Sequence, residues 1–512
     1  MATQWQTFPI EFKGGLISNL SALQHGSNAV GSATILQNFE ATKEGGYSKI
    51  KGYEKYSTTT VPGTGSILAL KVISAGRIVV ARKNASNVTE YYYGTGTSWT
   101  SIGSRPLLGT KARSAFYNLN GDDKVLFVDG VNYPATYNTS GNSLTAIASS
   151  TDVLGASHVA VFKDTAFYAK GNNVFFTAPS TVDNFAAGDG AGSISAASDV
   201  TGLAVFRDQL IIFTSDSIKR LTGSTSSDFQ VSPIASQMGC INGDTIQEVG
   251  GDIMYLAADG IRLLSATDRI GDFGLDIASD PITKDATKFL GSTSNFTSVI
   301  LREKAQYRIF AFIESEQNEV AKGLIATKLI AQGSSGMSWS TTFGIKAHIA
   351  DSRYSGTAET IAFANGDGYV YTMDTGSSFD GANIDGLYES PFMPLSDPQL
   401  RKSFYKITLY AKPTGPMDLG LNIKYDFDTR TNTGVIQPAT QRIQSTGTAV
   451  FLFGSSDSVF NTATFGGELD VVYNTNLVGS GKTIALRVED NSTNPTFTLD
   501  TALLEYRQND RQ

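Results

Sequence analysis

The chain has 512 residues, more than a single hydrophobic core usually supports, and carries a net charge of −8 at pH 7 with only 17% charged residues. Glycine (51 residues) and aromatic side chains (10%) are abundant, as in all-β proteins with many tight turns. Lysine and arginine form no basic patch, which disfavours tight nucleic-acid binding. Neither a secretion signal in Met1–Phe12 nor an apolar run of about 20 residues, the length of a membrane helix, is present. We expect a soluble protein made in a reducing cytoplasm.

Residues 1–60 are predicted to form an extended N-terminal segment. The glycine pairs Gly14–Gly15 and Gly45–Gly46 enclose a polar track rich in serine and asparagine. This track has too little apolar periodicity to fold by itself, so we expect it to dock on the propeller or platform domain described below.

Residues 61–386 repeat a pattern of short strands and tight turns. The clearest copies read AVFKDTAFYAKGNNVFFT and AVFRDQLIIFTSDSIKRLTG, with Asp164 and Asp208 at the same place, and Asp252 occupies that place in a third copy. Weaker copies place Gly76, Asp123, Gln306 and Glu359 there, and the successive spacings are 47, 41, 44, 44, 54 and 53 residues. A period of about 40 to 50 residues built from short strands predicts a β-propeller. We predict six or seven blades.

Two further predictions concern the rest of the chain. The best helix candidate is Asp280–Phe289, with Asp280 as its cap and Pro281 at the first helical position. Residues 387–512 contain about six longer alternating stretches separated by Pro, Gly and Asn turns. This pattern predicts an antiparallel β-sandwich, which we call the platform domain.

Motifs that could indicate a small-ligand or metal site have simpler explanations. Gly479–Thr483 resembles the end of a phosphate-binding loop, but Asn476 replaces the required glycine and the following residues alternate like a strand, so we predict a hairpin turn. Three acidic turns could contribute metal ligands, but none completes a calcium-loop pattern, and we interpret them as tight turns. They are Asn120–Asp123, Gly188–Gly190 and Asn365–Gly368.

Candidate catalytic groups are equally sparse. The three histidines, His25, His158 and His348, are far apart in the sequence and lie in no nucleophile or metal motif. The single cysteine, Cys240, has no neighbouring His or Lys to activate it, and we predict a small buried side chain. We therefore expect no enzyme, assign no catalytic, cofactor-binding or metal-binding residues, and expect no cofactor.

Several phrases of the sequence resemble a known family. They are FKGGLISNLS (12–21), LQNFEATKEGGYSKIKGYEKY (36–56), SIKRLTG (217–223), SQMGCINGDTIQEVGGDIMYLAADGIRLLS (236–265) and DPIT (280–283). Together they resemble the tail nozzle, or tail tubular protein B, group of short-tailed bacteriophages. The phrases span most of the chain but are structural rather than catalytic.

The resemblance implies a structural protein of the virion tail, made in the host cytoplasm during assembly. It implies a homohexameric ring below the head-to-tail adaptor, in contact with a tail fibre or tailspike and a tail needle. The ring would close the DNA channel until infection and then conduct double-stranded DNA without binding it specifically, with no insertion into a membrane. A surface without a basic patch suits this task, because DNA would pass without forming ion pairs.

Two alternatives stay open at this point. A receptor- or carbohydrate-binding propeller of a tail fibre or spike could stack sugars on an aromatic run such as Tyr91–Tyr93, although a strand packed between blades explains that run more simply. A propeller glycosidase would use paired carboxylates. The Ser-X-Asp-X-Gly-X-Thr-Trp turn of sialidase-like blades is absent, and Trp99 and Trp339 are interpreted as packing at blade edges.

Overall fold

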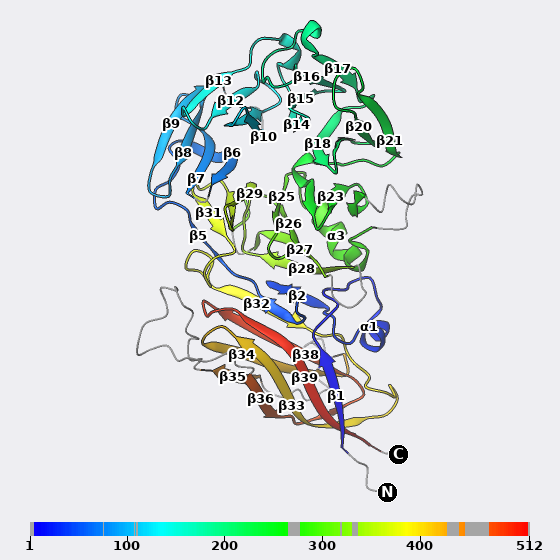
Figure 1. The fold of residues 1–512 in the computed structure, drawn as a ribbon. Coiled ribbons are helices and arrows are strands. Elements are labelled where there is room, and N and C mark those ends of the chain that lie inside the picture. Colours follow the sequence, from blue (N-terminus) through cyan, green and yellow to red (C-terminus); the bar gives the residue numbers. More distant parts are fainter. Residues whose placement is uncertain are drawn as a thin grey trace.

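The computed structural model describes residues 5–509, apart from 75, 107, 109–110, 265–276, 318–319, 330–335, 428–439 and 446–470. Figure 1 shows a ring of small sheets and, below it, a body of longer strands with both chain ends at its far end. Strands make up most of the described elements, which confirms the predicted all-β class. Within these residues, no helix is long and apolar enough to cross a membrane.

The ring is a β-propeller, as predicted. Its described residues form seven consecutive blades of three or four strands: six are separate sheets, and blade 6 is one end of a longer sheet. Blade 1 contains β6 (Thr64–Ser74), β7 (Arg77–Lys83), β8 (Thr89–Gly94) and β9 (Trp99–Arg105), and blade 2 contains β10 (Arg113–Leu119), β11 (Asp122–Val128), β12 (Ala135–Asn138) and β13 (Ser143–Ala146). Blade 3 contains β14 (His158–Phe162), β15 (Thr165–Lys170), β16 (Asn173–Phe176) and β17 (Gly192–Ser195), and blade 4 contains β18 (Val200–Phe206), β19 (Gln209–Thr214), β20 (Ser217–Thr222) and β21 (Gln230–Ser236). Blade 5 contains β22 (Gln247–Val249), β23 (Asp252–Ala257) and β24 (Gly260–Leu263). Blade 6 contains β25 (Phe296–Leu301), β26 (Gln306–Ala311), β27 (Lys322–Lys328) and β28 (Met337–Phe343). Blade 7 contains β29 (Ile349–Ser355), β30 (Ala358–Ala364), β31 (Val370–Met373) and β5 (Tyr53–Lys55). Single 3-10 turns precede or interrupt some blades: η1 (Thr151–Val153), η2 (Ala187–Asp189) and η3 (Gly243–Thr245).

The repeat seen in the sequence marks the hairpin between the first and second strands of a blade. Lys163 and Asp164 join β14 to β15 with φ values of 49° and 52°. Arg207 and Asp208 join β18 to β19 with φ values of 45° and 62°. Two consecutive residues of positive φ are the mark of a type I′ turn, whose twist matches that of the strands it joins. The 44-residue period is therefore the length of one blade.

The predicted helix lies between blades 5 and 6. Asp280–Ile282 forms a 3-10 turn (η4) and Thr283–Leu290 forms the α-helix α3, so the helix is confirmed. The predicted cap is wrong: Ser279 is the cap residue, without a side-chain hydrogen bond, and Asp280 is already inside the first turn. This insertion contributes to the longer 54-residue spacing between the repeats of blades 5 and 6.

Apolar side chains on both faces of a blade pack against its neighbours. Tyr91 of β8 contacts Phe127 of β11 with ring centroids 5.3 Å apart, and Phe213 of β19 contacts Tyr255 of β23 at the same separation. Burying one such side chain contributes roughly 1.5–3 kcal/mol. The blades thus share their cores, and the ring depends on every blade being present.

The N-terminal segment closes the ring. Its strand β5 pairs antiparallel with β31 and becomes the outer strand of blade 7. Residues 53–55, grouped with the N-terminal segment in the sequence analysis, therefore pair within the propeller. The ring is thus closed by hydrogen bonds between parts of the chain that are far apart in the sequence, and β5 forms the outer edge of blade 7.

The body below the ring is the predicted β-sandwich. One sheet contains β1 (Gln6–Glu11), β3 (Phe39–Ala41), β4 (Tyr47–Lys49), β33 (Lys402–Pro413), β36 (Val471–Asn476), β37 (Ser480–Gly481) and β39 (Phe497–Gln508). The facing strands are β32 (Ile384–Glu389), β34 (Met417–Tyr425), β35 (Gln441–Ser445) and β38 (Ile484–Ser492), and the helix α1 (Ala22–Asn28) lies beside them. Fully buried residues such as Leu409, Leu421 and Leu504 fill the space between the sheets.

A short strand joins the propeller to the platform. β2 (Ile35–Gln37) lies between β28 of blade 6 and β32 of the platform, so that one nine-stranded sheet runs from β25 to β35. The boundary at residue 386 accordingly falls inside β32, a platform strand. Because the two parts share a sheet, we expect them to move as one body.

Buried ion pairs hold residues 39–49 of the N-terminal segment against both the platform and blade 6. Lys49 of β4 donates to Asp490 of β38 at 2.6 Å, and the two side chains are 0% and 2% exposed. Glu40 of β3 accepts hydrogen bonds from Lys304 (2.6 Å) and from the fully buried Arg308 (2.8 Å) of the β25–β26 hairpin region in blade 6. Charges held away from water in this way are strongly coupled, since losing one partner leaves the other unpaired.

Candidate functional site

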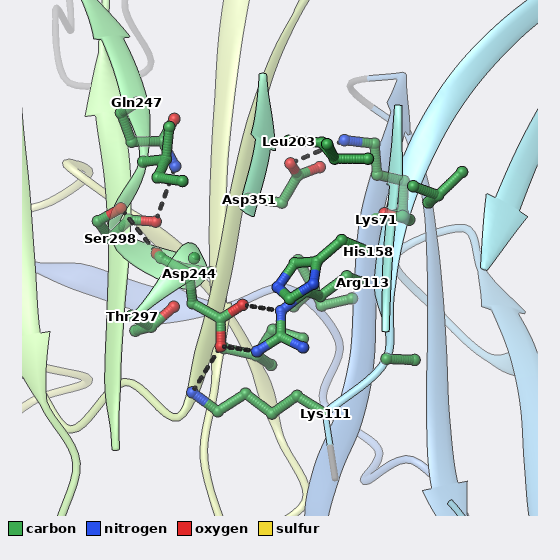
Figure 2. Close-up of a pocket in the computed structure, with 18 residues that line it drawn as sticks. Lys71, Lys111, Arg113, His158, Leu203, Asp244, Gln247, Thr297, Ser298 and Asp351 are labelled. Atoms are coloured by element: carbon green, nitrogen blue, oxygen red, sulfur yellow. Dashed lines mark hydrogen bonds and ion pairs between the residues drawn. The ribbon is translucent and has the colours of Figure 1, made fainter. Parts of the chain in front are cut away.

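Residues near the inner strands of all seven blades line one cavity on the propeller axis. Its volume is about 180 Å³, and its walls come from β6, β10, β14, β18, β25 and β29 and from η3 and the start of β22. Figure 2 shows that the polar side chains of this axial cavity point toward one another from opposite sides of the ring. We call its charged and imidazole members the axial cluster: Lys71, Lys111, Arg113, His158, Asp244 and Asp351.

Asp244 is the centre of the axial cluster. It lies in η3, whose first turn is capped by the side chain of Asn242, which accepts the Asp244 N–H at 2.9 Å. Arg113 of β10 donates to both carboxylate oxygens, Nε to Oδ1 at 2.6 Å and a terminal nitrogen to Oδ2 at 3.3 Å. Lys111 Nζ lies 3.7 Å from Oδ2. Burial alone would raise the pKa of Asp244, but the charges of Arg113 and Lys111 outweigh it, and the pKa lies below its ordinary value.

Lys111 connects blade 2 to blades 5 and 6. Its ammonium donates to the backbone oxygen of Phe296, the first residue of β25, at 2.9 Å. Burial lowers the pKa of Lys111 to about 8, although the neighbouring carboxylate of Asp244 raises it. The lysine is therefore charged at pH 7 but close to the range in which it loses its proton.

Two of the three histidines lie near cations of the axial cluster, His158 near Arg113 and His348 near Lys111, although the sequence separates them by 190 residues. Burial, together with the charge of Arg113, lowers the pKa of His158 to about 3. Burial, together with the charge of Lys111, lowers the pKa of His348 to about 4. Both imidazoles are therefore neutral at neutral pH. His25 lies elsewhere, in α1, where its Nε2 is 2.6 Å from the hydroxyl of Ser32.

Lys71 and Asp351 complete the cluster. Lys71 of β6 donates to Asp351 of β29 at 3.0 Å, and the backbone N–H of Val72 donates to the other carboxylate oxygen at 2.8 Å. This pair joins blade 1 to blade 7, next to the point where the ring closes. The axial cluster thus links blades across and around the axis, and its polar side chains surround the space that remains.

Sequence reasoning missed most of this cluster. Arg113 and Asp244 are 131 residues apart and become neighbours only because the ring brings blade 2 opposite blade 5. The one signal available was that charged or imidazole residues interrupt otherwise apolar first strands, as Arg113 and His158 do at the starts of β10 and β14.

The other motifs singled out in the sequence are structural. Gly479–Thr483 contains the short strand β37, which pairs with β33, and leads into β38, which pairs with β32 and β34 in the facing sheet. The segment therefore connects the two sheets of the sandwich: the predicted strand after it is confirmed, and the predicted hairpin turn is wrong. Asn120 and Gly121, both of positive φ, form the hairpin between β10 and β11. Gly190 ends η2 in the left-handed region, and Asn365 accepts the N–H of Asp367 at 2.9 Å. Within the described residues, no group of three or more potential ligands could hold a metal ion.

Tyr91, Tyr92 and Trp339 are buried in the fold, and Tyr93 is half-buried. Tyr91 lies in the core shared by blades 1 and 2, and Tyr92 lies in the core shared by blades 7 and 1. Tyr93 is covered by the guanidinium of Arg77, 4.8 Å from its ring centre. Trp339 is 1% exposed and its indole N–H donates to the backbone oxygen of Ala278 at 2.8 Å. None of these rings forms an open platform for a sugar.

Cys240 is buried, as predicted. Burial raises the pKa of its thiol to about 11, and the thiol lies 3.2 Å from the backbone oxygen of Asn242. A thiol that keeps its proton at neutral pH is a poor nucleophile. The side chain fills the core between blades 4 and 5.

No protein-family model matches the sequence, and no curated protein matches it. Solved structures do match. PorZ, a surface component of the type-IX secretion system of Porphyromonas gingivalis, is 13% identical over 67% of this chain with a TM-score of 0.37, and the match covers 43% of the PorZ chain. The WD40 β-propeller domain of Doa1 is 8% identical over 63% of this chain and 96% of its own, also with a TM-score of 0.37. Sqt1 of Saccharomyces cerevisiae gives the same identity, coverage of this chain and TM-score, with 99% of its own chain covered. These likenesses concern the fold alone.

Proposed function

We propose that the chain is a structural virion protein that forms the tail nozzle of a short-tailed bacteriophage. Copies assemble as a homohexameric ring below the head-to-tail adaptor, close the DNA channel until infection and conduct the genome on ejection. Fibres or tailspikes, and a tail needle, are its further partners. The proposal starts from the family resemblance, and the position of the resembling phrases in the fold supports it.

Three of the five phrases that carry the resemblance meet at the junction between propeller and platform, whereas residues 217–223 and 236–265 lie in blades 4 and 5. Ser18, in FKGGLISNLS, donates its backbone N–H to the carbonyl of Pro281, in DPIT, at 2.7 Å. Gly15, in the first phrase, donates to the hydroxyl of Tyr47, in LQNFEATKEGGYSKIKGYEKY, at 2.9 Å. Segments more than 250 residues apart in the sequence thus contact one another. This favours an architecture in common with the nozzle family over a chance similarity of sequence.

The buried charges of the junction belong to the same phrases. Glu40 and Lys49 both lie in residues 36–56, and their partners are Arg308 of blade 6 and Asp490 of the platform. The phrases therefore specify how the two domains are held together. A rigid link of this kind suits a ring that must resist the pressure of packaged DNA.

The propeller axis does not offer a path for DNA. The axial cavity holds about 180 Å³, roughly the volume that six water molecules occupy in the liquid. Ion pairs also cross it, with Arg113 reaching Asp244 from the opposite side of the ring. The DNA channel in this proposal therefore runs between subunits of the ring and not through a subunit. The net charge of −8 favours free passage, because phosphates meet few cations.

Electron cryo-microscopy of the phage particles that contain the chain tests this proposal. We expect a ring of copies on the tail axis, with adaptor density on one side and fibre or needle density beyond it. Copies placed along a fibre or spike, together with saccharide binding by the purified chain, would overturn it in favour of a receptor-binding propeller. The buried positions of Tyr91 and Tyr92 remove the aromatic run that suggested that alternative.

A further inference from the structure

We propose that the axial cavity binds a small carboxylate anion with a short apolar chain, of the size of acetate to butyrate. The proposal concerns the single subunit and does not depend on the nozzle function. Three independent observations support this proposal: the balance of charge in the cavity, a buried polar atom without a partner, and the shape of the cavity.

The first observation is an imbalance of charge. Lys71 is paired with one carboxylate, Asp351, whereas Lys111 and Arg113 share one carboxylate, Asp244. With His158 neutral, three cations face two anions inside the cavity. Lys111 is the most enclosed of the three cations, with its side chain 9% exposed against 28% for Arg113, and a cation held away from water favours a nearby counter-charge. One monovalent anion beside Lys111 and Arg113 would balance the site.

The second observation is a polar atom that lacks a partner. Nε2 of His158 is buried and makes no hydrogen bond within the described residues, although the side chain lines the axial cavity. His158 as a whole is 8% exposed. Buried polar atoms nearly always find a partner in the protein, in water or in a ligand. This atom therefore marks a place where a bound group belongs.

The imidazole of His158 has two possible tautomers. Its Nδ1 lies 2.9 Å from the hydroxyl of Ser157, and the same hydroxyl lies 3.4 Å from the carbonyl of Ala169, to which it can donate. A bound anion selects the tautomer in which the Ser157 hydroxyl donates to Nδ1, because Nε2 then carries the proton and donates to the anion.

The third observation is the shape and lining of the cavity. Its volume of about 180 Å³ exceeds what a single monatomic ion fills, and Leu203, Ile246 and Ile349 contribute apolar wall. Gly243 packs closely against blade 4 in the cavity wall, since an added Cβ would lie 2.0 Å from the backbone oxygen of Thr201 and 2.9 Å from Nε2 of His158. Polar donors and aliphatic side chains in the wall of one cavity match a carboxylate with a short apolar chain.

Fluorine NMR of trifluoroacetate with the full-length chain tests the proposal. We expect saturable broadening of the trifluoroacetate signal with one site per chain, reversed by butyrate. Absence of saturable binding to the wild-type chain overturns the proposal. Displacement by inorganic phosphate but not by butyrate overturns the carboxylate class and leaves an inorganic anion site.

Two variants and one control locate the binding. Lys111→Met and His158→Asn should each weaken trifluoroacetate binding about tenfold or more, because each removes a donor. Lys328→Met removes the same charge at a lysine that donates to Gly250 outside the cavity, and it should leave binding unchanged. Near-UV circular dichroism identifies a variant that fails to fold. If one variant does not fold, trifluoroacetate binding by the other variant tests the location of the site. Equal binding by a folded variant and the control overturns the assignment of the site.

Discussion

Removing one partner of the buried pair at the junction should open the contact between the N-terminal segment and the platform. In Lys49→Met, the carboxylate of Asp490 stays buried, with its side chain 2% exposed, and loses the ammonium that lies 2.6 Å away. Lys49 also donates to the backbone oxygens of Ser492 at 3.0 Å and Asn494 at 3.4 Å, and these bonds disappear as well. A buried pair broken in this way costs about 3–5 kcal/mol.

Hydrogen exchange measured by mass spectrometry reports this cost locally. Amides of β4 and β38 should exchange faster by roughly two to nearly four orders of magnitude, because the free energy of opening falls by that amount. The double variant Lys49→Met/Asp490→Leu replaces both charges by apolar side chains and should exchange more slowly than Lys49→Met. Lys13→Met is the matched control, since its pair with Glu11 is 62% and 61% exposed and contributes little. An increase of less than about tenfold in Lys49→Met would refute the reasoning, because the pair would then behave like a surface pair.

Three further predictions follow from single residues. Stability should fall as the pH drops below about 6.5, since the unfolded imidazoles of His158 and His348 gain protons there, whereas burial lowers their folded pKa values to about 3 and about 4. Urea unfolding at a series of pH values measures the free energy of unfolding, and in the double variant His158→Gln/His348→Gln this free energy should change less with pH between about pH 6 and 4.5. If the pH dependence is the same in the double variant, other groups cause it. Gly52→Ala should lower the melting temperature, because an added Cβ would lie 1.8 Å from a backbone oxygen and overpacking costs about 1–3 kcal/mol. Gly188→Ala is the control, since its Cβ would meet nothing within 4 Å. Equal melting temperatures of the two variants would contradict this prediction. Cys240 should react with iodoacetamide at pH 8 only as fast as the surrounding blades open, because burial raises its pKa to about 11, and rapid labelling of the native chain would contradict this.

Local features of the fold were predictable because short stretches determine them. The letters AVFKD and AVFRD each contain a two-residue hairpin turn, and Lys163–Asp164 and Arg207–Asp208 occupy it at equivalent places. Such a signal is complete within about ten residues. The helix following Asp280 was likewise predictable, but its cap was not, because Ser279 and Asp280 are both suitable cap residues and tertiary contacts select between them.

Features that depend on distant pairing were not predictable. β5 is three residues long and pairs with a strand more than 300 residues away, so nothing local distinguishes Tyr53–Lys55 from the rest of the N-terminal segment. The axial cluster has the same origin, since Lys111 and Asp244 meet only after the ring closes. A single sequence without a phased repeat for every blade does not show which first-strand residues face one another.

Particles assembled without this chain give the most direct test of the proposed nozzle. Electron microscopy would score the length of the tail and the retention of DNA in the head, compared with wild-type particles. The proposal predicts a truncated tail stump and heads that have lost their genome. Complete, DNA-filled particles that merely fail to adsorb to the host would contradict it and favour a receptor-binding propeller, and fully infectious particles would exclude a role in the virion.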